Sequence, residues 1–133
     1  CENEHYSHPE LRDGAEDGIK RGMYRLRQGD KRTKKRVQLL SCGTILREAM
    51  AAADMLESDY KVAVDVWSVT SFTELRRDGL DCDRWNLLHP DETPRDPYVT
   101  KQLAQVDAPV ITATDYMKTY GDLIRPWVPQ TYN

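Results

Sequence analysis

The sequence has no long apolar run, and no part of it approaches the roughly 18 apolar residues that a membrane-spanning helix requires. We therefore predict no membrane segment. The first ten residues, CENEHYSHPE, contain neither a basic start nor an apolar stretch. They predict no secretory signal at this position.

Cysteine is scarce as well. Cys1, Cys42 and Cys82 are an odd number of widely spaced thiols, and no two of them form a CxxC pair. This spacing favours neither a disulfide framework nor a zinc site built from cysteines. We expect reduced thiols and a cytoplasmic protein.

An excess of positive charge is also missing. The 19 Lys and Arg residues against 22 Asp and Glu residues give a formal net charge of -3. The chain as a whole therefore has no attraction for nucleic acid or anionic lipid. A local exception is a run of five cations: Lys31, Arg32, Lys34, Lys35 and Arg36. Because no aromatic residue interleaves with this run, we favour a solvated loop, with contact to an anionic partner as the alternative.

What is present fits one domain, and we predict that the 133 residues form a single domain over 1–133. The most regular pattern lies at 45–59, where apolar residues at three- and four-residue steps predict an amphipathic helix. Apolar, β-rich segments at 37–41 and 61–69 flank that helix. The three segments predict a right-handed βαβ unit with parallel strands.

The other segments extend this unit into an α/β three-layer domain with a small, mostly parallel sheet flanked by helices. Before the unit, the pattern predicts a short helix ending near Arg21 and a strand at 23–26 that forms a β-hairpin with 37–41. After it we expect a helical segment over 71–88 broken at Gly79, a loop over 89–99, a short helix, a strand over 108–115 and a helix over 116–128. The final VPQTYN predicts no closing element, so the chain resembles one truncated at its C-terminus.

Hydroxyl residues crowd the junction after the second strand of the βαβ unit, in the stretch WSVTSFTEL at 67–75. A nucleophile elbow requires glycines on both sides of a serine, and this stretch has none. Ser71 and Glu74 have instead the spacing of a helix capping box. We therefore predict that Ser71 is an N-cap.

The turn SCGT at 41–44 precedes the amphipathic helix, with Gly43 forming the turn and Thr44 the N-cap. Its free amides could hold an anion. The dinucleotide fingerprint, however, needs three spaced glycines, and only Gly43 is present. Cys42 has no evident basic partner to activate its thiol. A structural turn is favoured, and a hydrolase that uses Ser71 or Cys42 is a rival hypothesis.

Histidines and carboxylates complete the candidates. His5, His8 and His89 lack the spacing of metal ligands. Four carboxylates lack a spacing that defines acid–base catalysis: Asp81, Asp83, Asp91 and Glu92. His89 would act as a general base only if the fold brought it to a pocket.

Four blocks of the sequence resemble successive blocks of the homodimeric type of pyruvate dehydrogenase first component, a thiamine-diphosphate decarboxylase. They are DGAEDGIKRGMYRL, VQLLSCGTILREA, DVWSVTSFTELRRDGLDCDRWNLLHPDETPRDPYV and TDYMK. The likeness covers essentially the whole chain and begins with ENEHY. A departure lies at Ser41, Cys42 and Gly43, where the family tends to have Gly-Ser-Gly.

The resemblance implies a place in a larger enzyme. This chain is similar to the first part of the C-terminal, transketolase-like domain, whereas the family binds thiamine diphosphate and magnesium with its N-terminal and middle domains. The family's GDG signature is absent here, and its catalytic glutamate and histidines have no matching position. The resemblance therefore implies no catalytic, cofactor-binding or metal-binding residue in this chain, and thiamine diphosphate and magnesium only in the full-length enzyme.

The resemblance also implies partners. These are the other domains of the same subunit, a second copy in a homodimer, and the dihydrolipoyl acetyltransferase component that receives the acetyl unit on lipoyl groups. The chain itself would be inactive and structural. A stand-alone module that binds an anionic partner through the 31–36 loop is the alternative.

Overall fold

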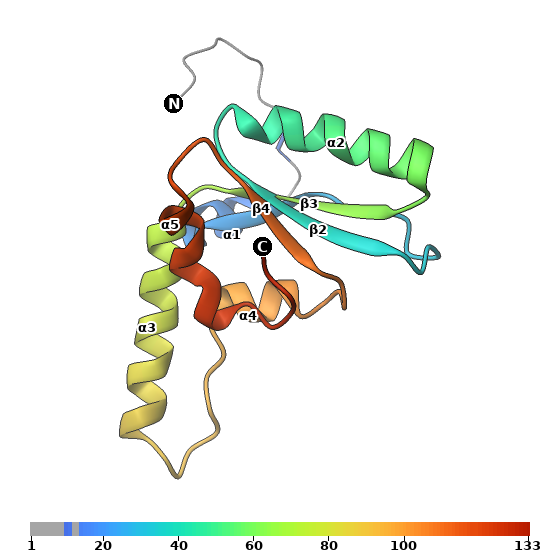
Figure 1. The fold of residues 1–133 in the computed structure, drawn as a ribbon. Coiled ribbons are helices and arrows are strands. Elements are labelled where there is room, and N and C mark those ends of the chain that lie inside the picture. Colours follow the sequence, from blue (N-terminus) through green and yellow to red (C-terminus); the bar gives the residue numbers. More distant parts are fainter. Residues whose placement is uncertain (1–9, 12–13) are drawn as a thin grey trace.

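Figure 1 shows the computed structural model of the protein, which describes residues 10–11 and 14–133. Helices and strands are interspersed along this part of the chain. In order they are α1 (Ala15–Arg21), β1 (Met23–Arg27), β2 (Arg36–Ser41), α2 (Ile45–Tyr60), β3 (Ala63–Val69), α3 (Phe72–Leu88), α4 (Tyr98–Leu103), β4 (Val110–Ala113), α5 (Lys118–Gly121) and the 3-10 helix η1 (Asp122–Trp127).

The predicted βαβ unit is confirmed. β2 and β3 pair in parallel, with Val37 opposite Val64 and Leu40 opposite Trp67, and α2 joins them. β4 lies parallel on the other side of β2, and β1 lies antiparallel on the other side of β3. The strand order is β1-β3-β2-β4, a mixed and mostly parallel sheet.

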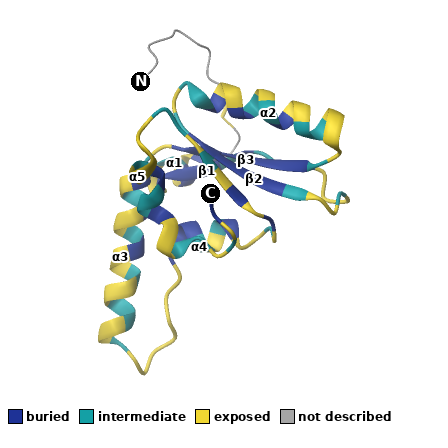
Figure 2. Ribbon diagram, in the orientation of Figure 1, coloured by how far each residue is buried: buried dark blue, intermediate teal, exposed yellow. Residues whose placement is uncertain are grey.

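Helices cover both faces of this sheet, so the α/β three-layer fold is confirmed (Figure 1). On the α2 side, the buried cluster includes Leu39, Leu46, Ala53, Val64 and Val66. On the side of α3, α4 and η1, it includes Leu40, Trp67, Phe72, Leu103 and Ile124. Successive residues of a strand point to opposite faces. For this reason, Val66 and Trp67 belong to different clusters, and Figure 2 shows β3 buried along its length.

The predicted β-hairpin is wrong, because β3 lies between β1 and β2. All seven residues of β3 are buried. A strand of this kind is stable at the centre of a sheet, with neighbours at both edges and helices on both faces. The segment after β1 therefore runs past the end of β3, where the Ala63 N–H donates to the Lys35 carbonyl (2.9 Å).

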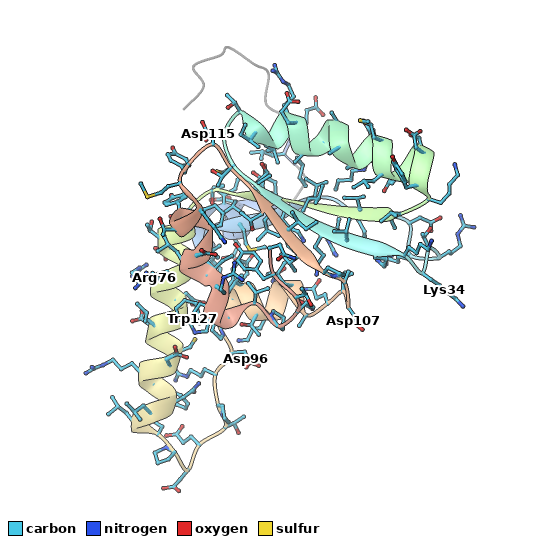
Figure 3. The ribbon with its side chains drawn as sticks, viewed as in Figure 1. Lys34, Arg76, Asp96, Asp107, Asp115 and Trp127 are labelled. Atoms are coloured by element: carbon cyan, nitrogen blue, oxygen red, sulfur yellow. The ribbon has the colours of Figure 1, made fainter. Side chains whose placement is uncertain are left out.

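Gly79 does not break the helix, contrary to the prediction. α3 continues through it to Leu88. A Cβ atom on Gly79 would lie 2.5 Å from a ring carbon of Trp127. Figure 3 shows Trp127 against α3. The glycine therefore serves close packing between α3 and η1.

The C-terminal segment also differs from the prediction. The expected helix over 116–128 is replaced by the single turn α5 and by η1, which contains Pro126. The last residues then pair with β4, since the Val110 N–H donates to the Thr131 carbonyl (2.8 Å) and the Asn133 N–H donates to the Val110 carbonyl (3.0 Å). These residues close the outer edge of β4, whereas the sequence predicted no closing element. None of the helices within residues 10–11 and 14–133 has the combination of length and apolar character that spanning a bilayer requires.

Candidate functional site

The hydroxyl residues at the end of β3 form a cap, as predicted. The Glu74 N–H donates to Ser71 Oγ (3.1 Å), and Ser71 Oγ also lies 3.0 Å from Thr73 Oγ1. Thr70 Oγ1 donates to the Ile19 carbonyl (2.8 Å). The stretch therefore ties α3 and α1 to the strand, and its hydroxyls are used for structure.

The capping box is incomplete, however. The Ser71 N–H donates to the Gly22 carbonyl (3.1 Å), so it does not need the Glu74 carboxylate. That carboxylate pairs with Arg77 (2.5 Å) instead. The hydrogen bond from Arg77 holds the pKa of Glu74 below its ordinary value.

We expect Ser71→Ala to lower the free energy of unfolding by about 1 kcal/mol, because the Glu74 N–H loses its acceptor. Ser71→Asn retains a cap oxygen and should stay close to the parent protein. Urea denaturation of the three proteins measures the difference. Equal destabilisation by both substitutions would show that the hydroxyl is not a cap.

The turn at 41–44 is structural. Gly43 has a φ of 57°, in the left-handed region that favours glycine. Thr44 stands at the N-cap position but makes no side-chain cap bond, so that part of the prediction is wrong. Cys42 Sγ lies 3.3 Å from Thr114 Oγ1. Burial raises the pKa of the Cys42 thiol, which makes it a poor nucleophile at neutral pH.

A cavity of about 370 Å³ lies where β4 ends. In parallel α/β sheets, ligands bind beyond the carboxyl ends of strands whose connections leave toward opposite faces. Here α2 follows β2 on one face, while α5 and η1 follow the neighbouring strand β4 on the other, which places this point between β2 and β4 (Figure 1). The cavity is lined by Ile45, Thr112, Ala113, Thr114, Tyr116, Lys118, Gly121, Asp122, Arg125, Tyr132 and Asn133.

Most polar groups of this cavity bond to one another. Arg125 binds Asp122 (2.6 Å) and donates to the Tyr132 carbonyl (2.8 Å). Tyr132 Oη donates to the Gly121 carbonyl (2.7 Å) and accepts from Thr112 Oγ1 (2.8 Å). Burial raises the pKa of the Tyr132 phenol. The network fastens the C-terminal residues to the sheet and leaves few donors for a ligand.

The remaining candidates do not converge on a site. His89 stacks on Trp85, with ring centroids 4.4 Å apart, and its Nδ1 lies 2.8 Å from the Trp85 carbonyl oxygen. Asp83 accepts a hydrogen bond from Trp127 Nε1 (3.0 Å), while Asp81, Asp91 and Glu92 are exposed. Within residues 10–11 and 14–133, no group of three or more His, Cys, Asp or Glu could hold a metal ion. His5 and His8 lie outside the described residues.

The basic run is only partly the solvated loop that the sequence favours. Arg32 and the three lysines are exposed, but Arg36 is the first residue of β2, and only 14% of its side chain is exposed. Its Nη2 binds Asp65 Oδ2 (2.7 Å), and Asp65 is fully buried. Arg25 approaches the other carboxylate oxygen at 3.9 Å. A buried ionic cluster of Arg25, Arg36 and Asp65 therefore underlies the loop.

Comparison with known families decides the assignment. The sequence profile described as the transketolase-like TK C-terminal domain matches residues 22–130. The chain belongs to this family.

Relatives of this transketolase-like domain include proteins named pyruvate dehydrogenase E1 component. The protein from Cupriavidus necator is 50% identical over 131 residues, 98% of this chain and 15% of the relative. The proteins from Pseudomonas aeruginosa and Escherichia coli K12 are 52% and 51% identical over 127 residues, 96% of this chain and 14% of each relative. The chain therefore spans about 15% of the length of these relatives.

The sequence analysis missed the ionic cluster of this transketolase-like C-terminal domain. One signal was available, since Asp65 interrupts the apolar strand AVDVWSV, where a carboxylate is costly to bury without a partner. The partners could not be found in the same way. Arg25 lies 40 residues before Asp65 and belongs to a strand that the sequence paired wrongly.

Proposed function

We propose that this chain is part of the C-terminal domain of a cytoplasmic, homodimeric pyruvate dehydrogenase subunit. In that subunit, pyruvate is decarboxylated on thiamine diphosphate with magnesium, and the acetyl unit passes to lipoyl groups of the dihydrolipoyl acetyltransferase component. Identity of 50–52% to relatives named pyruvate dehydrogenase E1 component, over nearly the whole chain, supports the proposal.

The described residues do not fit the cofactor. Magnesium prefers several oxygen ligands that converge on one point. The exposed carboxylates of α3 and of the loop that follows it form no such set. Thiamine diphosphate and magnesium would therefore be held by other domains of the subunit, and this chain would take no part in the proton transfers of the reaction.

The role of this chain would then be to contact other parts of the subunit or a second copy. The far end of α3 is the surface that supports this role. This end projects away from the sheet layers, with exposed residues along it (Figures 1 and 2). Leu87 and Leu88 are exposed at its tip. Exposed apolar side chains that gather on a projection mark a contact with another part of the protein or with a second copy.

The projection is also held in one shape. Asn86 Nδ2 donates to the Arg95 carbonyl (3.0 Å), and the Arg95 N–H donates to Asn86 Oδ1 (2.7 Å). The Arg95 guanidinium lies 3.8 Å above the ring centre of Trp85. A surface that is ordered in advance loses little conformational entropy on contact.

Leu88→Asp tests this role. In the 133-residue chain we expect no measurable change in stability, because the side chain is 60% exposed. In the full-length subunit we expect a smaller dimer fraction or a lower thermal midpoint, together with slower pyruvate decarboxylation. Analytical ultracentrifugation, thermal denaturation and an activity assay measure these quantities.

Met55→Asp is the matched control. Met55 is also 60% exposed, but it lies on α2 beside the charged residues Asp54 and Asp59. It should leave the full-length subunit unchanged. If Leu88→Asp left dimerisation, stability and activity of the full-length subunit intact, the contact role would be refuted. Decarboxylation by the 133-residue chain alone, with thiamine diphosphate and magnesium added, would refute the proposal that the chemistry lies elsewhere.

A further inference from the structure

The ionic cluster opens into a cavity of about 570 Å³ that the proposed function does not use. It lies between β1, the loop that follows β1, and the segment after α4. Its lining residues are Arg25, Gln28, Lys31, Arg36, Gln105, Val106 and Asp107. We propose that this cavity binds the carboxylate or phosphate group of a small organic anion.

The lining of this cavity carries an excess of positive charge. Arg25, Lys31 and Arg36 bring three positive charges to the lining, and Asp107 brings one negative charge. Asp65 lies behind the two arginines and compensates one more. The nearby Asp30 carboxylate does not compensate the lining, because it pairs with Arg32. It accepts a hydrogen bond from the Arg32 backbone N–H (2.9 Å) and lies 3.4 Å from the Arg32 guanidinium. One positive charge is therefore left over, although the chain as a whole carries -3.

Two of the three cations in the lining have hydrogen-bond donors available for a ligand. The Arg25 side chain makes no hydrogen bond within the described residues, and 26% of it is exposed. Lys31 is exposed, and its side chain has no ion pair within the described residues. Arg36 differs, because both of its Nη atoms are engaged and its Nε is buried without a partner in the described structure. Arg25 and Lys31 would therefore bind the anion, and Arg36 would contribute charge.

The cluster is preorganised. Arg36 is fixed by Asp65 Oδ2 (2.7 Å) and by the Asp30 carbonyl (2.8 Å). Arg25 is placed by Asp65 and by Trp67, whose ring centre lies 5.4 Å from the guanidinium carbon. The root of the loop is packed against β3, since a Cβ on Gly29 would lie 2.6 Å from the Val64 nitrogen. Binding an anion would require little reorganisation of these groups.

A neighbouring cavity helps to define where in the lining the anion would bind. It shares Arg25 and Gln28 and is lined as well by Asp17, Arg21 and Tyr98. There the Arg21 guanidinium lies 4.0 Å above the Tyr98 ring centre and 3.8 Å from the Asp17 carboxylate. Because Arg21 already has these partners, the uncompensated charge lies on the Lys31 side of Arg25. Asp107 faces the same cavity and would accept a hydrogen bond from a hydroxyl or ammonium group of the ligand.

The test uses the full-length subunit with thiamine diphosphate and magnesium bound, so that the cofactor's own diphosphate site is filled. Inorganic phosphate and succinate are titrated separately by calorimetry. Arg25→Gln and Lys31→Gln should each weaken binding about tenfold, the effect of a lost charge-assisted hydrogen bond. Crystals soaked in tungstate should show the anion between these two side chains.

Lys34→Gln is the matched control, since it removes the same charge from the same loop. Lys34 is exposed at the end of that loop (Figure 3). It is not among the residues that line the cavity. It should change affinity by less than about twofold, because solvent and salt screen its charge. Thermal midpoints establish that each variant is folded. A weakened phosphate titration alone assigns the site to phosphate esters, and a weakened succinate titration alone assigns it to carboxylates.

Two results would overturn the proposal. One is an unmodified subunit that binds neither anion. The other is a folded Arg25→Gln variant that binds both anions as well as the parent does. Pyruvate decarboxylation is measured on the same unmodified subunit. If the subunit decarboxylates pyruvate but binds neither anion, the anion site is refuted and the proposed function stands. If it does not decarboxylate pyruvate, the proposed function fails.

Discussion

Replacement of Gly22 by alanine is expected to lower the free energy of unfolding by about 3 kcal/mol or more. Gly22 follows α1 with a φ of 103°, a backbone conformation that side chains disfavour. A Cβ there would also lie 2.7 Å from the Ser71 carbonyl oxygen. That contact cannot relax cheaply, because the Thr70 and Ser71 N–H groups both donate to the Gly22 carbonyl (2.9 and 3.1 Å). Chemical denaturation measures the loss.

Gly43→Ala separates the two causes. Gly43 also has a positive φ, 57°, but a Cβ there would meet nothing within 4 Å. It should therefore show only the cost of the left-handed conformation, about 1 kcal/mol. Equal losses for the two substitutions would mean that contact with Ser71 contributes nothing, and that the cap is not held by Gly22.

Asp65→Ala is expected to cost about 3 kcal/mol in the free energy of unfolding. The carboxylate is fully buried, and its removal leaves the Arg36 guanidinium in the interior without its counter-charge. The Gly29 N–H loses a weak bond to Asp65 as well (3.4 Å). Thermal or urea denaturation gives the value.

Asp54→Ala is the control, because the pair of Asp54 with Arg27 lies at the surface, with Asp54 70% exposed. Exposed ion pairs contribute less than about 1 kcal/mol. Combining Arg36→Leu with Asp65→Leu should restore part of the stability that Asp65→Leu loses, since Arg36, the more buried of the two arginine partners, is then no longer left without its counter-charge. Strictly additive losses would exclude coupling between the two residues.

The parts of the fold that the sequence predicted are local. In the βαβ unit, alternating Val62, Val64 and Val66 mark the strand, and the periodic apolar residues of α2 mark the helix. All three elements are contiguous in the chain, and each pattern is complete within its own segment. The cap at Ser71 was predicted for the same reason.

The parts that the sequence missed depend on distant partners. β1 has the pattern of a strand, but the pattern of residues 23–27 does not identify β3, at 63–69, as its pairing partner. Gly79 has the composition of a helix break until Trp127, 48 residues later, is placed against it. The proposed anion cavity is lined by residues of β1, of the loop after it and of the segment after α4. The run of cations at 31–36 therefore indicated only two of its lining residues, Lys31 and Arg36.

The strand order has a consequence for synthesis of the chain. β1 leaves the ribosome before the other strands of this sheet, and its partner β3 is made 36 to 46 residues later, after β2 and α2. Until then, the buried side of β1 has no sheet to join. Within this sheet, the βαβ unit at 36–69 is thus the first piece that can begin to assemble, and β1 joins it only after β3 has been made. Such distant pairings slow folding and prolong exposure of apolar surface, so we expect the nascent chain to depend on chaperones until β3 has emerged.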